Sequence, residues 1–582
     1  MNKNSTVIDF APESVPMRRT TWFIYLSAYV ILLAFVGDNA LNGDEGIMAE
    51  GIRLTSGGID IFSPQCWWQP DDRSLLWFCR LRMLPALIFG SSELICRLFS
   101  ILASIGVLWC TMSLTGDFFN RRSGACAAWM LIGSYGFIYW GRFAGNFMTL
   151  AFWVLFTTLC LRNACDRFWW RTVIFTLIFS GTMWWGMNYL LFLPGIWLIT
   201  WSDGYGVLLR KQWFFAVIAA AVIAIAAGCW LVGFAGVPWA EYPARFFRQF
   251  KASFLESCHI AIWPGTGGAG NFYRSPVNFL RLLLPWTLPA LAAAAGMIRK
   301  WKELSYDHRR LLAGTLFMLI CTGIFPGRRW QYQLSLLPFF IMICAGVTAE
   351  CVGVDSWSRL ADRIMWWSFC VLGSLAVAVI VTWPLWQMIF GFSPPLWIMF
   401  GMPVLGLASL AFLVFDTGGG SAVERVSGMN GPWSGYILSG VCLMTACFVV
   451  GVSSLDRYRS GRPFWKHCGV LVRHLPAHEV IYFGSFPDAK QLYYLELPTP
   501  CPIVSDPGEL AAILPQIHSG EALLMIKRAD IEAVSAALDN AGWSMEHRKP
   551  LAVEAGAINF YNDEFADDSK FIICRIRRGS DR

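Results

Sequence analysis

Two adjacent carboxylates, Asp44 and Glu45, follow an apolar run at residues 21–37 by only a few positions. A carboxylate this close to lipid is costly unless it is paired or wet. One use for such a group is to take a proton from an acceptor hydroxyl or amine, which makes Asp44 a candidate general base. Two alternatives stay open for Asp44, an exposed loop acid or the N-cap of a short helical segment at 46–54. Glu45 is expected to orient Asp44, to hold a metal, or only to face solvent.

Three arginines lie where apolar runs end on the same side as Asp44: Arg142 and the pair Arg328-Arg329. A phosphate leaving group gains negative charge as its bond breaks, and guanidinium groups stabilise that charge bidentately. The alternative for these arginines is snorkelling to lipid headgroups. A reaction in which a phosphate leaves and an acceptor loses a proton therefore requires a carboxylate and several cations at the same depth in the membrane.

Aromatic residues near these ends are candidates for stacking on a sugar or lining a lipid cleft, or else for anchoring at the interface. They are Tyr273, Trp286 and Tyr332. No metal site is predicted elsewhere, because Pro476 separates His474 from His478 and the eighteen Cys contain no CxxC pair. The cysteines are interpreted as small buried apolar residues.

The elements that position these residues are membrane spans. The 582 residues are 56% hydrophobic and 15% charged, and a soluble domain carries about 25% charged residues. The net charge of +7 comes from short basic clusters between apolar runs, which is a topology signal rather than a nucleic-acid surface. Thirteen candidate spans are long enough to cross, tilted or paired where short: 21–37, 95–115, 124–140, 144–161, 172–185, 188–201, 212–235, 278–298, 309–325, 330–350, 364–387, 394–415 and 434–453.

The positive-inside rule orients these spans. With residues 1–20 in the cytoplasm, every cytoplasmic loop is basic, as in Arg121-Arg122 and Arg210-Lys211. The short outside loops contain few basic residues apart from Arg142 and Arg328-Arg329. An odd number of spans places residues 454–582 across the membrane, which is the periplasm for a bacterial inner membrane. The fifth and sixth spans are short and nearly continuous, so a count of twelve stays open.

Three segments lie outside the membrane spans, two of them loops of the 21–453 membrane domain and the third the C-terminal part of the chain. Long outside loops are expected at about 38–94 and 236–277, the first with a short helical segment and interfacial aromatics. The second contains the glycine run Gly265–Gly270, which lacks the Lys-Ser/Thr of a phosphate loop and is interpreted as a mobile loop. From 454 the composition predicts a small α/β domain with strands at 480–484, 522–526 and 571–576 and helices at 507–516 and 530–541.

Short motifs over residues 20–350 occur in a consistent order: Asp44-Glu45 with Ala49-Glu50 and Arg53, Phe89–Leu94, Gly141-Arg142 with Asn146, Leu284-Pro285-Trp286, and Arg328–Tyr332 before Leu337-Pro338. In this order and topology the chain resembles the bacterial lipid A aminoarabinose transferases and their dolichyl-phosphate-mannose protein mannosyltransferase relatives. Three positions depart from that pattern. Asn146 stands where the family has an aspartate, Gly186-Met187 replaces a Lys-Gly pair, and Gln69-Pro70-Asp71-Asp72-Arg73 replaces a Lys-Pro-Pro-like stretch.

The resemblance implies a C-type glycosyltransferase fold that moves one sugar, with inversion, from a polyprenyl-phosphate donor to an outer-face acceptor. That acceptor would be lipid A, another lipid or glycan, or a protein. It implies catalytic roles for Asp44 and Glu45, and substrate-cleft positions for Asn146, Tyr273, Trp286 and Tyr332. The donor phosphate would bind Arg142, Arg328, Arg329 and Arg73. No cofactor is expected beyond a divalent metal as an alternative. Two other classes stay open, a non-catalytic binding or scaffold protein of this fold and a transporter.

Overall fold

The computed structural model describes residues 15–57, 82–200, 274–350, 367–381, 396–416, 433–451, 462–546, 552–553 and 571–579, with short gaps inside several of these ranges. Contacts divide the chain into two units. The helical unit comprises Met1–Val36 and Arg97–Gly451, and the α/β unit comprises Gly37–Cys96 and Val452–Arg582. The first long loop of the sequence thus belongs to the same contact group as the C-terminal residues.

The helical unit contains most of the apolar helices. Their bounds are α1 Val15–Leu33, α4 Glu93–Phe118, α5 Arg121–Ile132, α6 Tyr135–Gly141, α7 Phe147–Arg162, α8 Phe168–Trp185, α9 Met187–Leu190, α10 Leu193–Thr200, α14 Arg274–Leu282, α15 Thr287–Arg299, α16 Tyr306–Ile324, η4 Trp330–Leu336, α17 Leu337–Glu350, α19 Leu396–Asp416, α21 Trp433–Thr445 and the π-helical η5 Ala446–Gly451. A helix lies at each candidate span that the structure describes, because a helix satisfies its backbone hydrogen bonds internally in lipid.

Three stretches in the described part of the chain are long and apolar enough to cross a membrane: Glu93–Phe118, Gln331–Thr348 and Ser434–Gly451. Shorter apolar helices occur at Thr20–Leu33, Phe147–Arg162, Thr287–Arg299 and Phe400–Val414. The chain is a multi-pass membrane protein by these criteria. The count of thirteen spans and the side on which the C-terminal residues lie stay predictions.

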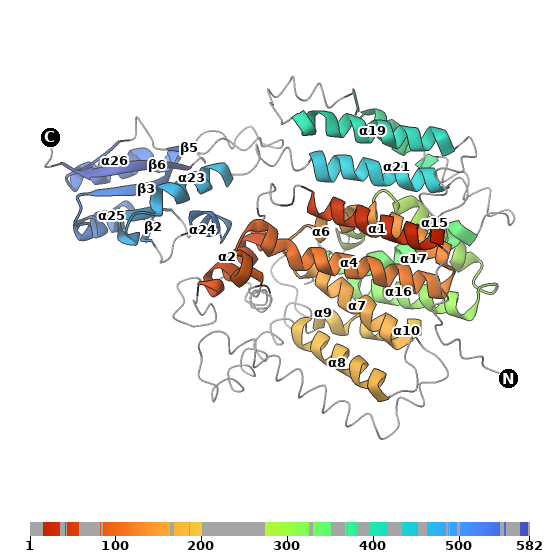
Figure 1. The fold of residues 1–582 in the computed structure, drawn as a ribbon. Coiled ribbons are helices and arrows are strands. Elements are labelled where there is room, and N and C mark those ends of the chain that lie inside the picture. Colours follow the sequence, from red (N-terminus) through yellow and green to blue (C-terminus); the bar gives the residue numbers. More distant parts are fainter. Residues whose placement is uncertain are drawn as a thin grey trace. The chain divides into compact units, whose positions relative to one another are not determined.

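Small and hydroxylated residues let the helices of this unit pack closely. α10 and α16 meet at Gly195 and Gly314, where a Cβ on Gly314 would lie 2.7 Å from the Gly195 carbonyl oxygen. α19 and α21 run side by side (Figure 1), and the hydroxyls of Ser409 and Ser439 are 2.7 Å apart between them. Such contacts are typical of helix association in membranes, where apolar burial alone gives little driving force.

The α/β unit is built on one mixed sheet. Its strands are β1 Val480–Phe483, β2 Ile503–Val504, β3 Glu521–Lys527, β4 Trp543–Met545, β5 Ala552–Val553 and β6 Phe571–Arg578. The order is β2-β1-β3-β6-β4, with β5 also paired to β6. β1 is parallel to β2 and β3, and β6 is antiparallel to β3. The three predicted strands are confirmed as β1, β3 and β6, and the three short strands were not predicted.

Helices cover both faces of this sheet. Leu510 of α25 (Pro507–Ile513) and Val534 of α26 (Ile531–Asn540) share a core with Ile481, Leu524 and Cys574 on one face. On the other face, Trp465 of α23 (Arg462–Val472) contacts the rings of Tyr482 and Phe571. The unit also contains α2 (Gly43–Ser56), which confirms the helical segment predicted in the first loop, and α24 (Ala489–Leu495).

Candidate functional site

The turn between α6 and α7, residues 142–146, carries two of the predicted site residues, Arg142 and Asn146. Gly141 lets this turn approach the neighbouring helices, because a Cβ there would lie 2.7 Å from both the Leu32 Cδ2 atom and the Ser104 hydroxyl oxygen. The Ser100 hydroxyl of α4 donates to the carbonyl oxygen of Gly145 at 2.9 Å. Helices α1 and α4 thus fix the position of the turn.

Arg142 is buried, with 5% of its surface exposed, and its guanidinium binds the ends of two other helices. Nη2 donates to the carbonyl oxygen of Ala34, which follows α1, at 2.5 Å, and Nη1 donates to that of Phe448 in η5 at 3.3 Å. The last carbonyls of a helix lack intrahelical donors and carry partial negative charge. A guanidinium is well matched to such a position, so Arg142 joins α1, η5 and the turn.

A second buried arginine meets the same end of α1. Arg97, near the start of α4, is 2% exposed and donates from Nη1 to the carbonyl oxygen of Val36. Two guanidinium groups therefore bind main-chain carbonyls within residues 34–36. Arg97 is not among the site residues predicted from the sequence. The signal that identifies it is the cost of a charged side chain at the start of an apolar span, which such a residue avoids only by burial with partners.

Asn146 is the buried amide of this turn, with 3% of its surface exposed. Its main-chain carbonyl begins α7 by accepting from the Leu150 N–H at 3.0 Å and the Thr149 hydroxyl at 2.6 Å. Its side-chain Oδ1 has no hydrogen-bond partner among the residues that the structure describes. A buried acceptor without a partner costs about 1–3 kcal/mol. This oxygen is therefore placed to accept a hydrogen bond from a bound molecule or a water.

Tyr332 lies beside this turn. It is half-buried in η4, and its ring meets that of Phe147, the first residue of α7, edge-on at a centroid distance of 5.4 Å. Phe147 in turn contacts Trp140, whose ring centroid is 5.0 Å away. The structure thus brings Arg142, Asn146 and Tyr332 to one end of α7.

Trp286 occupies a different environment. Its side chain is fully buried, its indole N–H donates to the Met130 carbonyl at 2.5 Å, and its ring meets Tyr436 edge-on. A Cβ on Gly440 would lie 2.4 Å from the indole, so α21 approaches the ring closely. These contacts are those of a helix-packing residue, with the indole nitrogen satisfied by protein.

The candidate acids lie in the α/β unit, on α2. Asp44 is in the first turn of this helix, and Glu45 is buried with 1% of its surface exposed. Further along, Arg53 donates to both carboxylate oxygens of the buried Glu50 at 2.8 and 2.6 Å. Burial raises the pKa of Glu50, and the hydrogen bond and charge of Arg53 only partly offset this rise.

Several predicted site residues lie outside the described part of the chain: the side chain of Asp44, and all of Arg73, Tyr273, Arg328 and Arg329. The second long loop, 236–277, lies outside it almost entirely. The approach of Asp44 to Arg142 at one cavity stays a prediction. Within the described residues, no group of three or more His, Cys, Asp or Glu side chains has the arrangement of a metal site.

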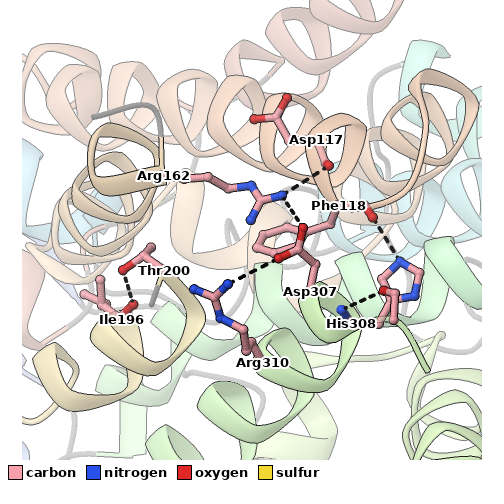
Figure 2. Close-up of polar contacts among 9 residues, drawn as sticks. Asp117, Phe118, Arg162, Ile196, Thr200, Asp307, His308 and Arg310 are labelled. Atoms are coloured by element: carbon pink, nitrogen blue, oxygen red, sulfur yellow. Dashed lines mark hydrogen bonds and ion pairs between the residues drawn. The ribbon is translucent and has the colours of Figure 1, made fainter. Parts of the chain in front are cut away.

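The opposite end of α7 carries a separate polar cluster, shown in Figure 2. Asp307 at the start of α16 accepts from Arg162 at 3.1 Å and from Arg310 at 3.3 Å, and Arg162 also donates to the Asp117 carbonyl at 3.3 Å. His308 contacts the Phe118 carbonyl at 2.9 Å. α7 has 16 residues and is therefore about 24 Å long. The turn at Arg142 and this cluster are thus separated by nearly the thickness of a hydrocarbon core.

Comparisons with known proteins identify the fold. No protein-family model matches the sequence, and no curated protein matches it. The structure is similar to crystal structures of ArnT from Cupriavidus metallidurans, one bound to undecaprenyl phosphate (TM-score 0.62, 15% identity) and one in the apo state (TM-score 0.60, 16% identity). Each comparison covers 95% of this chain and 97% of the other. The chain therefore has the ArnT-like C-type glycosyltransferase fold, as the motif order predicts.

Proposed function

We propose that this chain is a membrane glycosyltransferase that takes a sugar from a polyprenyl-phosphate donor. The observation that carries this proposal is the similarity of fold over 95% of the chain to a protein solved with undecaprenyl phosphate. A fold can host several functions, so the chain must also contain a site with the right chemistry.

The two buried arginines at the end of α1 support a phosphate at that depth. Arg97 and Arg142 place two positive charges beside the main-chain carbonyls of residues 34–36. These carbonyls lie at the negative end of α1, which attracts cations. Burying two positive charges in a membrane protein carries a large desolvation free energy, and a bound anion at the same place offsets part of it. We infer that Arg142 takes part in binding the donor phosphate, together with the predicted cations Arg73, Arg328 and Arg329.

The proposed reaction is a single displacement with inversion. The acceptor oxygen or nitrogen forms a bond to the anomeric carbon of the sugar. The bond from that carbon to the phosphate oxygen breaks, and the polyprenyl phosphate leaves with the electron pair. The acceptor proton passes to the Asp44 carboxylate, and the arginines stabilise the charge that develops on the phosphate.

The remaining site residues are assigned to orientation and substrate contact. Glu45 is buried next to Asp44 on α2 and is proposed to orient it. Asn146, Tyr273 and Tyr332 are proposed to line the substrate cleft, whereas Trp286 is assigned to helix packing, because its ring is fully buried and its N–H donates to the Met130 carbonyl. Among these, Asn146 has the clearest support, because its buried Oδ1 lacks a hydrogen-bond partner within the described residues and is able to accept one from a sugar hydroxyl.

The proposed location is a bacterial inner membrane, with transfer at the periplasmic face. The acceptor class follows from that side and comprises lipid A, another envelope lipid or glycan, or a protein. Arg142 supports this orientation, since it lies at the end of α1 opposite the N-terminal segment, and the basic cluster at Arg162 and Arg310 lies at the other end of α7.

A non-catalytic role in binding a lipid-linked sugar is the second candidate. Asn146 favours it, because an amide in the turn beside Arg142 binds hydroxyls but takes no proton. A binding protein of this kind would retain donor affinity and release no polyprenyl phosphate.

Incubating the purified full chain with a radiolabelled polyprenyl-phosphate sugar and membrane-lipid acceptors decides between the two candidates. The transferase releases polyprenyl phosphate and labels an acceptor, and Asp44→Asn lowers turnover by roughly 10²–10⁴-fold with little change in donor Kd. Asn146→Ala is the matched control and costs less. Donor binding without release would support the binding protein instead, and full turnover in Asp44→Asn would remove Asp44 as the base.

A further inference from the structure

The C-terminal domain packs directly on the helix that carries the candidate acids. Within the α/β unit, α24 lies against α2, and α23 lies against α24. Trp465 of α23 is anchored on the sheet through Tyr482 and Phe571. A continuous series of contacts thus leads from the sheet to the helix of Asp44 and Glu45.

The approach of the two helices is closest at Gly46. A Cβ at this position would lie 2.7 Å from the backbone nitrogen of Lys490 and 2.9 Å from its Cβ. The backbone nitrogen belongs to α24 itself, so any side chain at position 46 forces one helix away from the other. Glycine is therefore required two residues after Asp44 by the docking of α24.

Two tyrosines of α24 hold the chain on either side of α2. The Tyr494 hydroxyl accepts the buried N–H of Leu41, three residues before Asp44, at 2.9 Å. The neighbouring Tyr493 hydroxyl donates to the carbonyl oxygen of Ser91 near the end of the loop. Because the first long loop enters and leaves through these two points, α24 fixes both.

Two ion pairs to the buried Glu93 reinforce the contact at Ser91. Glu93 is 5% exposed, and its carboxylate oxygens lie 2.8 Å from Nη2 of Arg462 and 3.1 Å from Nζ of Lys466, both on α23. The Lys466 ammonium also lies 5.5 Å from the centre of the Tyr494 ring. A buried ion pair contributes little net stability, but it favours one register over others because a misplaced partner leaves a charge buried alone.

We propose that the C-terminal domain is the positioning element of the acid-bearing loop, with Tyr494 and Gly46 as positioning residues that hold α2 in the geometry that turnover requires. This rests on the proposed function, in which Asp44 accepts the proton. A displacement of about 1 Å at a reacting group lowers turnover by as much as about 10²-fold. The domain therefore acts on kcat through α2, and donor affinity, which depends on the arginines, is expected to change little.

Two substitutions in the full chain test this proposal. Tyr494→Phe removes the acceptor for the Leu41 N–H, and Gly46→Ala separates α24 from α2. Each has a control of the same chemical type. Ser519→Ala removes a hydroxyl that donates to the Glu521 carbonyl oxygen at 2.8 Å, outside α23 and α24, and Gly57→Ala adds a Cβ at the end of α2 whose nearest neighbour lies 3.4 Å away.

Hydrogen exchange of the α2 amides and steady-state kinetics are measured on all four variants. Tyr494→Phe and Gly46→Ala are expected to accelerate exchange of α2 by about ten-fold or more and to lower kcat with donor KM nearly unchanged. The controls leave both quantities at the wild-type values. In an Asp44→Asn background the effect of Tyr494→Phe on kcat disappears, because a residue that acts through Asp44 has nothing further to displace.

The outcomes separate this proposal from the proposed function. Unchanged α2 exchange in both variants, or faster exchange with wild-type kcat, overturns the positioning role. An effect of Tyr494→Phe on kcat that persists in full with Asp44→Asn shows that the domain does not act through Asp44. A wild-type protein that consumes no donor is a failure of the proposed function, and it removes the catalytic part of this proposal. The exchange data alone then decide whether the domain holds α2.

Discussion

Replacing Arg142 by methionine separates its contribution to packing from its proposed contact with the donor. Methionine retains a long apolar side chain but removes both guanidinium bonds, at 2.5 Å to Ala34 and 3.3 Å to Phe448. Hydrogen bonds from a charged group are worth about 1.5–3 kcal/mol each, so the two bonds contribute roughly 3–6 kcal/mol. The methionine variant also no longer has to bury a charge, and the desolvation free energy it avoids offsets part of this loss. The expected net loss of stability is therefore about 2–4 kcal/mol.

Arg162→Met is the matched control at the other end of α7. Arg162 is also largely buried and also bonds two groups, the Asp307 carboxylate at 3.1 Å and the Asp117 carbonyl at 3.3 Å. It is about 24 Å away along the 16 residues of α7. Both variants are expected to lower the apparent Tm of the purified protein. Arg142→Lys is the milder variant, because the ammonium keeps the charge but cannot match the planar fork of a guanidinium.

Donor affinity distinguishes the two positions. If Arg142 contacts the phosphate, Arg142→Met raises the donor Kd by roughly 10–100-fold relative to Arg162→Met, measured as Kd per mole of folded protein. An equal Kd in the two variants would leave Arg142 as a packing residue alone. An unchanged Tm in Arg142→Met would refute the energetic argument from its carbonyl partners.

Three further outcomes are expected. Because the pKa of Glu50 is raised above its ordinary value of 4.5, its contribution to stability is fully present below that value and is lost as the pH rises through the folded pKa. Thermal melts across this range should show a decline in wild type that Glu50→Gln lacks. Trp286→Ala should cost about 3–5 kcal/mol with little change in donor KM per folded protein, and a selective loss of donor binding would point to a substrate contact instead. A topology reporter fused after Arg582 should be active only in the periplasm, and activity in the cytoplasm would contradict the odd number of spans.

The membrane helices and the main strands were predictable because their signals are local. An apolar run in lipid has to satisfy its backbone groups within itself, so the candidate spans at 95–115 and 144–161 coincide with α4 and α7. The apolar runs at 480–484 and 571–576 likewise became β1 and β6. The short strands β2, β4 and β5 carry too few residues for a pattern, and they exist only through their pairing with longer strands.

The partners of individual side chains were decided by tertiary structure. The sequence predicted Arg142 to be a cation on the outside of the membrane, but its bonds to Ala34 and Phe448 join residues 108 and 306 positions apart. The bond between Leu41 and Tyr494 spans 453 positions, so no local pattern indicates that the C-terminal domain holds the first loop. The sequence by itself determined the long apolar helices and the three longer strands, because hydrophobic periodicity and backbone hydrogen bonding act over a few residues. Only the folded chain decided which ends meet, because the close approach of Gly46 to Lys490 depends on the packing of two helices from opposite ends of the protein.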